Sequence, residues 1–456
     1  MVVERSDALV FFGATGDLAF KAIFPALAAL AADGRLAMPI VAVGRKPLPI
    51  EELRARVKKS LAASDAKVSK DAFERFAELL AYVEVDFDEA ATFSRIRKAI
   101  GDAEHPLHYV ALPPEVFENV ATNLAKAGLA SGARIVLEKP FGHDLASAKA
   151  LSTAIHASFP EEAIFRIDHF LGKESVENIA YFRAANPLFE KSLQHDQVES
   201  VQITMAETFG VKGRGKFYDG VGALRDVVQN HMLELVTCLA MDLPVKLGGA
   251  ELRAERSKLL ARVHPVSAND IVRGQARGYA AEDGIPKDSK TETFAALRIT
   301  IDSPRWRDVP FFIRAGKYLP VTATEALIRW KQPEGKSFDE PSLPAPNHLR
   351  LRIGPEPAIA LGANVKTNGA AMVGAPTELV LCRPEADPMT AYERLLGDAI
   401  DGDPALFARK DEVEAAWRVV EPTLGDVTPV HLYETGSWGP PEAARISPKG
   451  GWHDPR

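Results

Sequence analysis

Two short stretches of this chain bring together side chains that could do acid–base chemistry beside a bound anion. The first, residues 166–174, has the sequence Arg-Ile-Asp-His-Phe-Leu-Gly-Lys-Glu and places an acid, an imidazole and a lysine close together. The apolar run at 163–165 is typical of a buried strand, and Gly172 indicates a turn into a helix. Ligands bind at such strand ends in open α/β sheets. A solvated loop is the alternative.

The second stretch, residues 224–231, has the sequence Leu-Arg-Asp-Val-Val-Gln-Asn-His and lies in a predicted helix from about 221 to 240. For Asp226 or His231 taken singly, the alternative explanation is that each lies on the solvent-exposed face of an ordinary helix. Five kinds of polar residue in one short apolar helix are unusual, however. A histidine titrates near neutral pH and suits a general base, so the residues alone leave two candidates, His169 and His231.

The start of the chain predicts a scaffold for these side chains. The apolar run Ala8–Phe12 predicts a buried strand, and a glycine turn leads from it into a helix that continues to about Ala32. Glycines let the backbone approach a pyrophosphate, and the amides that open the helix attract its charge. Because a second strand follows at 38–44, dinucleotide binding is favoured over a mere turn. The candidate residues are Gly13, Thr15, Gly16, Asp17 and Leu18.

The end of that second strand indicates which dinucleotide binds. Rossmann folds that recognise a free ribose 2′-hydroxyl place an acidic residue there, whereas a 2′-phosphate requires a basic one. Here the chain continues Gly44-Arg45-Lys46, and an arginine fork suits the phosphate of NADP. We therefore expect NADP to be preferred, although one basic residue does not exclude NAD. The alternative is a solvated basic turn.

Strands and helices continue to alternate up to about residue 170, which predicts a doubly wound sheet in a Rossmann-type domain of residues 1–170. Its last strands deliver Lys139 to the carboxyl edge, where an ammonium can reach cofactor and substrate. The further predicted helices are 50–63, 69–81 and 89–101, and the further strands are 82–85, 108–112 and 134–138.

Residues 171–456 are predicted to form a larger α+β domain with a mostly antiparallel sheet and helices. Polar and apolar residues alternate there over several short runs. The tail after Glu442 carries no such pattern, so we expect it to be mobile. The predicted strands are 198–206, 293–302, 309–315, 325–331, 347–353, 356–362 and 376–382.

The composition excludes several classes of protein. The chain has 456 residues and a net charge of -7, which argues against general nucleic-acid binding. Its two cysteines, Cys238 and Cys382, lie far apart and predict neither a disulfide framework nor a metal site. No run approaches the roughly 18 apolar residues of a membrane span, and the N-terminus shows no targeting signal. We expect a cytoplasmic protein.

Several motifs, spread over essentially the whole chain, resemble those of the glucose-6-phosphate dehydrogenase family. Residues 166–174 are similar to the family's RIDHYLGKE signature, with Phe170 where tyrosine is usual. The spacing from Glu207 through Asp226 to His231 also matches. The other similar segments are 109–114 (YLALPP in the family), 138–142 (EKPFG), 224–231 (RDVMQNH), 314–317, 391–396 and 436–440.

This resemblance implies oxidation of D-glucose 6-phosphate to 6-phospho-D-glucono-1,5-lactone with reduction of NADP, the first step of the oxidative pentose phosphate pathway. It implies that His231 is the base and that Asp168 is its carboxylate partner. His169 and Lys173 would bind the 6-phosphate, since two donors on a short turn suit a dianion. The residues implied for the sugar hydroxyls or the phosphate are Lys139, Glu207, Asp226 and Lys317, and Lys139 would also border the cofactor.

The resemblance further implies a homodimer or homotetramer that assembles through the second domain's sheet. No metal is expected, because hydride transfer belongs to the nicotinamide cofactor. The departures from the family pattern affect supporting positions. Phe170 lacks a hydroxyl that could touch the phosphate, and the positions with missing basic side chains are 20, 22, 322 and 323.

Two other functions stay open at this point. An oxidoreductase for an unphosphorylated sugar or inositol would keep the glycine turn and Glu138-Lys139-Pro140, but it would not need His169 with Lys173. A dinucleotide sensor without catalytic activity would bind the cofactor and oxidise no sugar. The joint presence of Asp168, His231 and Lys139 argues against such a sensor.

Overall fold

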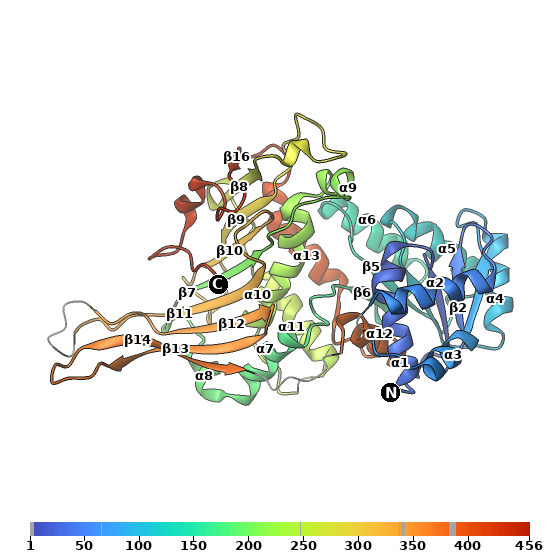
Figure 1. Ribbon diagram of the computed structural model, residues 1–456, viewed down its shortest axis with the longest axis horizontal. Helices are drawn as coiled ribbons and strands as arrows, with labels where there is room; N and C mark the ends of the chain where they lie inside the picture. The colour runs from blue at the N-terminus through green and yellow to red at the C-terminus, as the bar shows by residue number, and fades with distance from the viewer. Residues whose placement is uncertain (1–3, 65, 247, 337, 339–342, 383–388) are drawn as a thin grey trace. The chain divides into compact units, whose positions relative to one another are not determined.

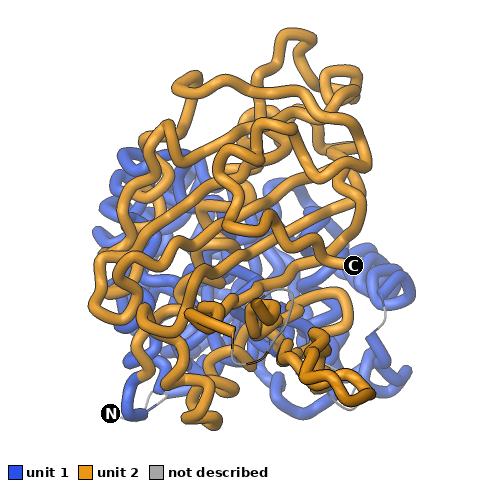
Figure 2. The backbone as a smooth tube through the Cα atoms, turned by 90° about the vertical axis from the view of Figure 1, so that its left-hand side faces the viewer, with its two compact units in different colours: residues 1–174, 244–257, 388–414 blue, residues 175–243, 258–387, 415–456 orange. Residues whose placement is uncertain are grey.

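The computed structural model describes residues 4–64, 66–246, 248–336, 338, 343–382 and 389–456. They form two compact units (Figure 2). The first consists of residues 1–174 with two later segments, 244–257 and 388–414. The second consists of residues 175–243, 258–387 and 415–456. Within the described part of the chain, no helix is long and apolar enough to cross a membrane.

The first unit is built on a seven-stranded sheet in the order β15-β6-β5-β4-β1-β2-β3 (Figure 1). All neighbouring strands are parallel except the short edge strand β15, which pairs antiparallel to β6. Strands β1 to β6 follow the doubly wound order 3-2-1-4-5-6, so the predicted Rossmann-type fold is confirmed. The strands are β1 (Ala8–Phe12), β2 (Ile40–Gly44), β3 (Leu80–Glu84), β4 (Pro106–Val110), β5 (Arg134–Glu138), β6 (Ile164–Ile167) and β15 (Phe407–Ala408).

The central strands of this sheet are apolar throughout because helices cover the sheet. Every residue of β1 and β2 is buried. Helix α1 packs with α2, α3 and α12, and α5 packs with α6. The helices of this unit are α1 (Phe24–Ala32), α2 (Ile50–Ala62), α3 (Lys70–Glu78), α4 (Ser94–Ile100), α5 (Phe117–Lys126), α6 (Leu145–His156) and α12 (Ala391–Asp401).

The second unit is built on a nine-stranded sheet in the order β14-β13-β12-β11-β7-β10-β9-β8-β16. Only β7 with β10 and β8 with β16 are parallel among its described pairs, which confirms the predicted mostly antiparallel sheet. The strands are β7 (Val198–Ala206), β8 (Ile271–Ala276), β9 (Phe294–Ile299), β10 (Phe311–Gly316), β11 (Ala323–Trp330), β12 (His348–Gly354), β13 (Ala358–Lys366), β14 (Gly374–Cys382) and β16 (Val430–Tyr433).

The predicted helix over 221–240 has two geometries. Leu224–Met232 forms wide π-helical turns, and α10 (Leu233–Ala240) continues as an ordinary α-helix. π-Helical turns are rare and often occur at functional sites. The remaining helices are α7 (Glu174–Ala185), α8 (Pro187–Ser192), α9 (Gly215–Asp219), α11 (Gly249–Ala261) and α13 (Lys410–Val420).

The C-terminal tail is held in place, so the expectation of a mobile tail is wrong. The Arg314 guanidinium lies 4.3 Å from the ring centre of Trp438 and 5.0 Å from that of Trp452. It also donates to the His453 carbonyl at 3.0 Å and to Asp454 Oδ1 at 2.9 Å. No local pattern indicates these contacts, because the partner, the buried strand residue Arg314, lies 140 residues before Asp454 in the sequence.

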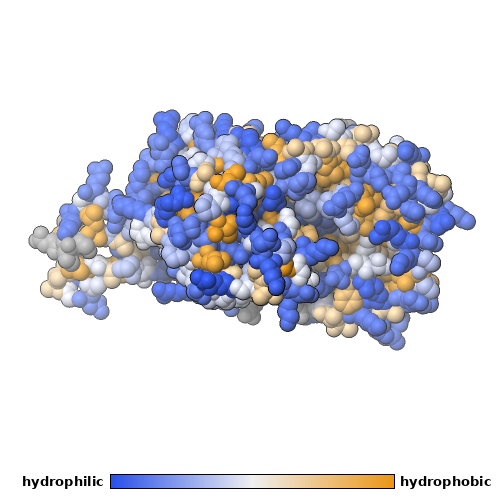
Figure 3. Space-filling model, turned by 90° about the horizontal axis from the view of Figure 1, so that it is seen from above, coloured by the Kyte–Doolittle hydropathy of each residue, from blue (hydrophilic) through white to orange (hydrophobic). Residues whose placement is uncertain are grey.

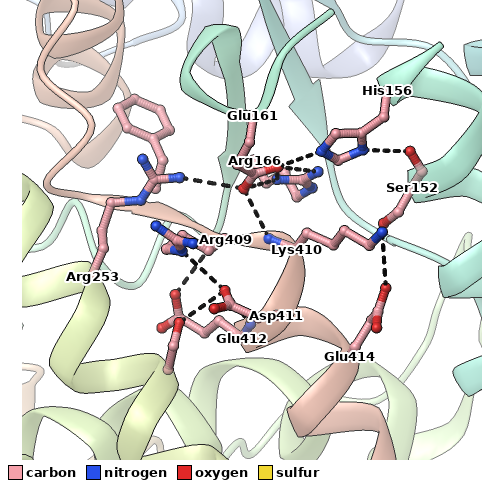
Figure 4. A network of polar contacts seen from close by, with 12 residues as sticks. Ser152, His156, Glu161, Arg166, Arg253, Arg409, Lys410, Asp411, Glu412 and Glu414 are labelled. Carbon is pink, nitrogen blue, oxygen red and sulfur yellow. Dashed lines mark hydrogen bonds and ion pairs between the residues drawn. The ribbon is translucent and has the colours of Figure 1, made fainter.

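A network of ion pairs fixes the edge of the first sheet beside β6 (Figure 4). Glu161 accepts two hydrogen bonds from Arg166 Nη1, at 2.9 and 3.1 Å, and one from the Lys410 backbone at 3.0 Å. His156 Nε2 lies 2.9 Å from Glu161 Oε2. Burial acts to raise the pKa of Glu161. Arg166 and the other donors outweigh burial, so this pKa is lowered. The network therefore ties β6 to the chain segment that contains β15.

The same network holds β15 from its other side. Arg256 donates to the backbone carbonyls of Ala405 and Phe407, at 3.0 and 3.1 Å, and to Glu412 Oε1 at 2.8 Å. Arg256 and Glu412 are both almost fully buried. Buried charges of this kind are stable only when they are paired and hydrogen-bonded. Segments 244–257 and 388–414 belong to the first unit through these contacts.

Replacing Glu161 with Gln should lower the free energy of unfolding by about 3 kcal/mol, because the buried Arg166 guanidinium keeps its charge and loses its charged partner. Urea unfolding followed by circular dichroism measures this change. Glu51→Gln is the matched control, since Glu51 pairs with Arg54 on the exposed surface and should matter little. Equal losses in both variants would show that the network adds nothing.

Candidate active site

The glycine turn after β1 leaves its backbone open to a ligand. Gly13 has a φ of +85°, and a Cβ there would collide with the Ala111 carbonyl. Thr15 and Gly16 are exposed, as is Asp17. The carbonyls of Thr15 and Gly16 each accept a hydrogen bond from Arg56 at 2.9 Å, and these two bonds hold the loop in place. The turn therefore exposes backbone just before a helix begins, and helix starts are common anion-binding positions.

The end of β2 presents a cation to solvent. Arg45 is exposed, and its guanidinium lies 6.0 Å from the ring centre of Phe87. Gly44 before it leaves room for the Tyr82 hydroxyl, which donates to the Lys46 carbonyl at 2.5 Å. Since the turn is fixed by this bond, the Arg45 side chain extends from a defined position.

The predicted loop after β6 forms a tight turn around a buried carboxylate. Asp168 is only 4% exposed, and its Oδ1 accepts the Phe170 amide at 2.9 Å. The Lys173 ammonium lies 3.7 Å from the ring centre of Phe170, a close cation–π contact. The His169 ring meets the edge of Phe170 with centroids 5.4 Å apart. Phe170 thus holds the imidazole and the ammonium on one turn.

A buried carboxyl lies behind this loop in the same unit. Glu138, the last residue of β5, is 7% exposed and accepts the Tyr109 hydroxyl at 2.5 Å. Tyr392 also hydrogen-bonds it, and the Tyr392 ring lies parallel to that of His169 at 6.5 Å. Burial raises the pKa of Glu138 to about 7, while the Tyr109 hydroxyl and the Lys139 ammonium act to lower it. Tyr392 thus lies between the Glu138 carboxyl and the His169 ring.

In the second unit, Glu207 and Lys317 lie side by side because they follow neighbouring parallel strands. Ala206 at the end of β7 is in register with Gly316 at the end of β10. The Lys317 ammonium donates to Glu207 Oε2 at 2.6 Å. It also lies 5.1 Å from the ring centre of Phe209. The pair places one cation and one carboxylate at the carboxyl edge of this part of the sheet.

The π-helical segment contributes the remaining predicted residues of the second unit. Asp226 and His231 are five residues apart, and five residues is the hydrogen-bond spacing of a π-helix, so they lie on one face. His231 is 3% exposed, and its backbone amide donates to Asn230 Oδ1 at 2.7 Å. Asn230 in turn donates to the Arg225 carbonyl at 3.0 Å. Side-chain bonds of this kind fix the irregular backbone around the histidine.

The structure thus divides the predicted residues between the units. Those in the first unit are Gly13, Thr15, Gly16, Asp17, Leu18, Arg45, Lys139, Asp168, His169 and Lys173, and those in the second are Glu207, Asp226, His231 and Lys317. Sequence reasoning missed the buried groups that support them. Glu138 precedes Lys139 in the segment 138–142, and Tyr392 lies in the segment 391–396. Both segments resemble family motifs. Their hydroxyl and carboxyl contacts are not visible as a local pattern.

The raised pKa of Glu138 predicts a pH effect on stability. Its carboxyl favours folding fully below its unfolded pKa near 4.5 and loses that contribution as pH rises through about 7. Relative to Glu138→Gln, whose amide stays neutral, the wild type should lose up to about 3 kcal/mol of unfolding free energy over this window. Urea titrations of both proteins at pH 4.5 and 8 measure it, and parallel pH profiles would contradict it.

Comparisons with known proteins agree with this geometry. The glucose-6-phosphate dehydrogenase NAD binding domain profile matches residues 10–178, and the C-terminal domain profile of the same enzyme matches residues 180–453. Glucose-6-phosphate 1-dehydrogenase 1 of Mycobacterium bovis is 39% identical over 99% of this chain and 97% of its own length.

Two solved structures are similar over 99% of this chain. One, from Mycobacterium avium, is a glucose-6-phosphate 1-dehydrogenase with 40% identity and a TM-score of 0.92, and 99% of that chain is covered. The other, a glucose-6-phosphate dehydrogenase in complex with glucose 6-phosphate, has 32% identity and a TM-score of 0.91, and all of it is covered. The chain therefore belongs to the glucose-6-phosphate dehydrogenase family.

Proposed function

We propose that this protein oxidises D-glucose 6-phosphate to 6-phospho-D-glucono-1,5-lactone with reduction of NADP, the entry step of the oxidative pentose phosphate pathway. The observation that carries the proposal is the turn after β6. It joins a buried carboxylate, Asp168, to an imidazole, His169, and an ammonium, Lys173, within six residues. Family membership over the whole chain supports the same substrate.

The 6-phosphate is assigned to His169 and Lys173. A phosphate dianion needs several charged donors at short range, and a lysine ammonium with an imidazole beside it supplies them. Phe170 supports this assignment because its ring contacts both side chains. The missing tyrosine hydroxyl removes one possible phosphate contact. The cation–π contact keeps Lys173 in place without it.

Proton removal from the C1 hydroxyl is assigned to His231, with Asp168 as the carboxylate that fixes its tautomer and stabilises the imidazolium. A bound nicotinamide cofactor supplies the hydride acceptor. Lys139, Glu207, Asp226 and Lys317 are assigned to the sugar hydroxyls or the phosphate, and Lys139 also to the cofactor. Glu207 with Lys317 supports this role, because a paired carboxylate and ammonium offer an acceptor and a donor together.

The cofactor is assigned to the domain of residues 1–170, at Gly13, Thr15, Gly16, Asp17 and Leu18. The exposed backbone of Thr15 and Gly16 supports the fit, as does Gly13, whose tight turn leaves no room for a Cβ beside the Ala111 carbonyl. NADP is proposed over NAD because β2 is followed by the exposed Arg45 and not by an acidic residue. NAD remains a possible second cofactor.

The domain of residues 171–456 is assigned to substrate binding and to assembly of a homodimer or homotetramer. Strand β14 lies at the edge of the nine-stranded sheet, and its Leu379, Val380 and Leu381 are exposed. Figure 3 shows hydrophobic residues among polar ones at its left end, where the β13–β14 hairpin of Figure 1 extends. Exposed apolar edges of this kind favour association. Sedimentation equilibrium distinguishes a dimer from a tetramer.

A cytoplasmic location is also proposed, since the two cysteines, Cys238 and Cys382, lie far apart in the sequence and indicate no disulfide framework.

The proposed function is tested by initial rates of reduced-cofactor formation with purified protein. Glucose 6-phosphate is compared with glucose, each with NADP and with NAD. We expect a large preference for the phosphorylated sugar and for NADP. Equal turnover of glucose would instead favour an oxidoreductase for unphosphorylated sugars. Cofactor binding without any turnover would favour a dinucleotide sensor.

Two substitutions test the assigned roles separately. His231→Asn should lower kcat about 10²- to 10⁴-fold, the usual contribution of a general base, and leave NADP affinity nearly unchanged. Lys173→Ala should raise the KM for glucose 6-phosphate by about tenfold or more, because a charge-assisted contact is lost.

Steady-state kinetics and fluorescence titration of NADP measure these effects. Lys70→Ala, on an exposed helical lysine, is the control and should change neither constant. Retained turnover in His231→Asn would remove it as the base, and an unchanged KM in Lys173→Ala would move the phosphate site elsewhere.

A further inference from the structure

The hydroxyl of Tyr218 is buried and has no hydrogen-bond partner among the described residues. The side chain is 3% exposed. Three tyrosines of the same unit differ in this respect, because Tyr279 donates to Asp219, Tyr318 to Glu282 and Tyr433 to the Lys317 carbonyl. Leaving a buried hydroxyl unpaired costs free energy, so each such group in a folded protein needs an explanation.

The Tyr218 ring is fixed in position. It lies in the short helix α9 and packs against Tyr279 with centroids 6.1 Å apart at 70°. The carboxylate of Asp219, the next residue, accepts hydrogen bonds from Tyr279 and Ser289. At the start of α9, a Cβ on Gly215 would collide with the Asp283 carbonyl, so the backbone packs tightly there too. The hydroxyl therefore cannot easily move to find a partner.

The neighbours of Tyr218 are the residues already assigned to the sugar. The Lys317 ammonium lies 5.3 Å from its ring centre. Burial raises the pKa of Tyr218 well above its ordinary value, and the nearby carboxylates of Asp226 and Glu292 add to this, with smaller effects from Tyr433 and Glu207. The phenol consequently stays protonated at any pH at which the protein works, and it is available as a neutral donor.

A neutral donor beside two carboxylates and an ammonium suits a sugar ring. Each sugar hydroxyl can both donate and accept, so Glu207 and Asp226 accept from it while Lys317 and a phenol donate to it. We propose that Tyr218 is a further substrate-binding residue, whose hydroxyl donates to one ring hydroxyl of the hexose phosphate. This inference rests on the proposed assignment of Glu207, Asp226 and Lys317 to the sugar.

Tyr218→Phe provides the first test, because it removes one oxygen from an otherwise unchanged ring. If the hydroxyl donates to the substrate, kcat/KM for glucose 6-phosphate should fall about tenfold, which corresponds to one lost hydrogen bond. The urea midpoint should stay constant or rise, since an unpaired buried hydroxyl is removed. The KM for NADP should not change. A lower urea midpoint with unchanged kcat/KM would mean that a buried water pairs the hydroxyl, and it would overturn the proposal.

Tyr279→Phe is the matched control. Its hydroxyl already has a protein partner, Asp219, so this variant should lose stability and keep its kcat/KM.

Monodeoxy analogues of glucose 6-phosphate identify the contacted hydroxyl. For the analogue that lacks it, wild type and Tyr218→Phe should have the same kcat/KM, because the contact is absent from both. An equal tenfold ratio for every analogue would contradict a direct contact.

Lys317→Met separates failure of this inference from failure of the proposed sugar site. A raised KM in Lys317→Met with an unchanged Tyr218→Phe would overturn the role of Tyr218 alone. An unchanged KM in Lys317→Met would overturn the sugar site on which it rests.

Discussion

The ion pair between Glu161 and Arg166 is the contact on which the geometry of the first unit's candidate site depends. Arg166 lies in β6, two residues before Asp168, and its side chain is almost fully buried. On one side β6 pairs with β5, but on the other it has only the two-residue strand β15. So short a strand contributes few ladder hydrogen bonds. The charged network therefore fixes where β6 ends and where the loop after it begins.

Burial acts on two glutamates of this unit in opposite ways, and the difference follows from their partners. Glu161 is surrounded by Arg166, Arg253 and a backbone donor, so its pKa falls despite burial. Glu138 meets two phenols and one ammonium, which are weaker partners, so burial prevails and its pKa rises to about 7. Glu161 therefore stays charged within the ion-pair network beside β6. Glu138 can be neutral close to Lys139, so it imposes no fixed charge there.

Much of the fold could be predicted from the sequence because its pattern is local. The bounds of β1, β5 and β7 agree with the predicted strands, and each of these strands has a clear apolar or alternating run. Strands β8, β15 and β16 were missed, and β16 (Val430–Tyr433) is only four residues long. Ile271–Ala276 contains a buried arginine and a glycine, and Phe407–Ala408 is too short to show any period. Such strands exist because a distant strand pairs with them.

For the candidate site, the sequence has the same limit as for the fold. Charged side chains that follow an apolar strand, such as Asp168 and Lys317, are visible in the sequence because the strand before them is. The roles of Tyr392 and Tyr218 are not visible, since a tyrosine in a helix is ordinarily a packing residue. What distinguishes them is the partner of the hydroxyl, which only the folded chain shows. Tyr392 hydrogen-bonds a buried carboxyl, whereas Tyr218 has no such partner among the described residues.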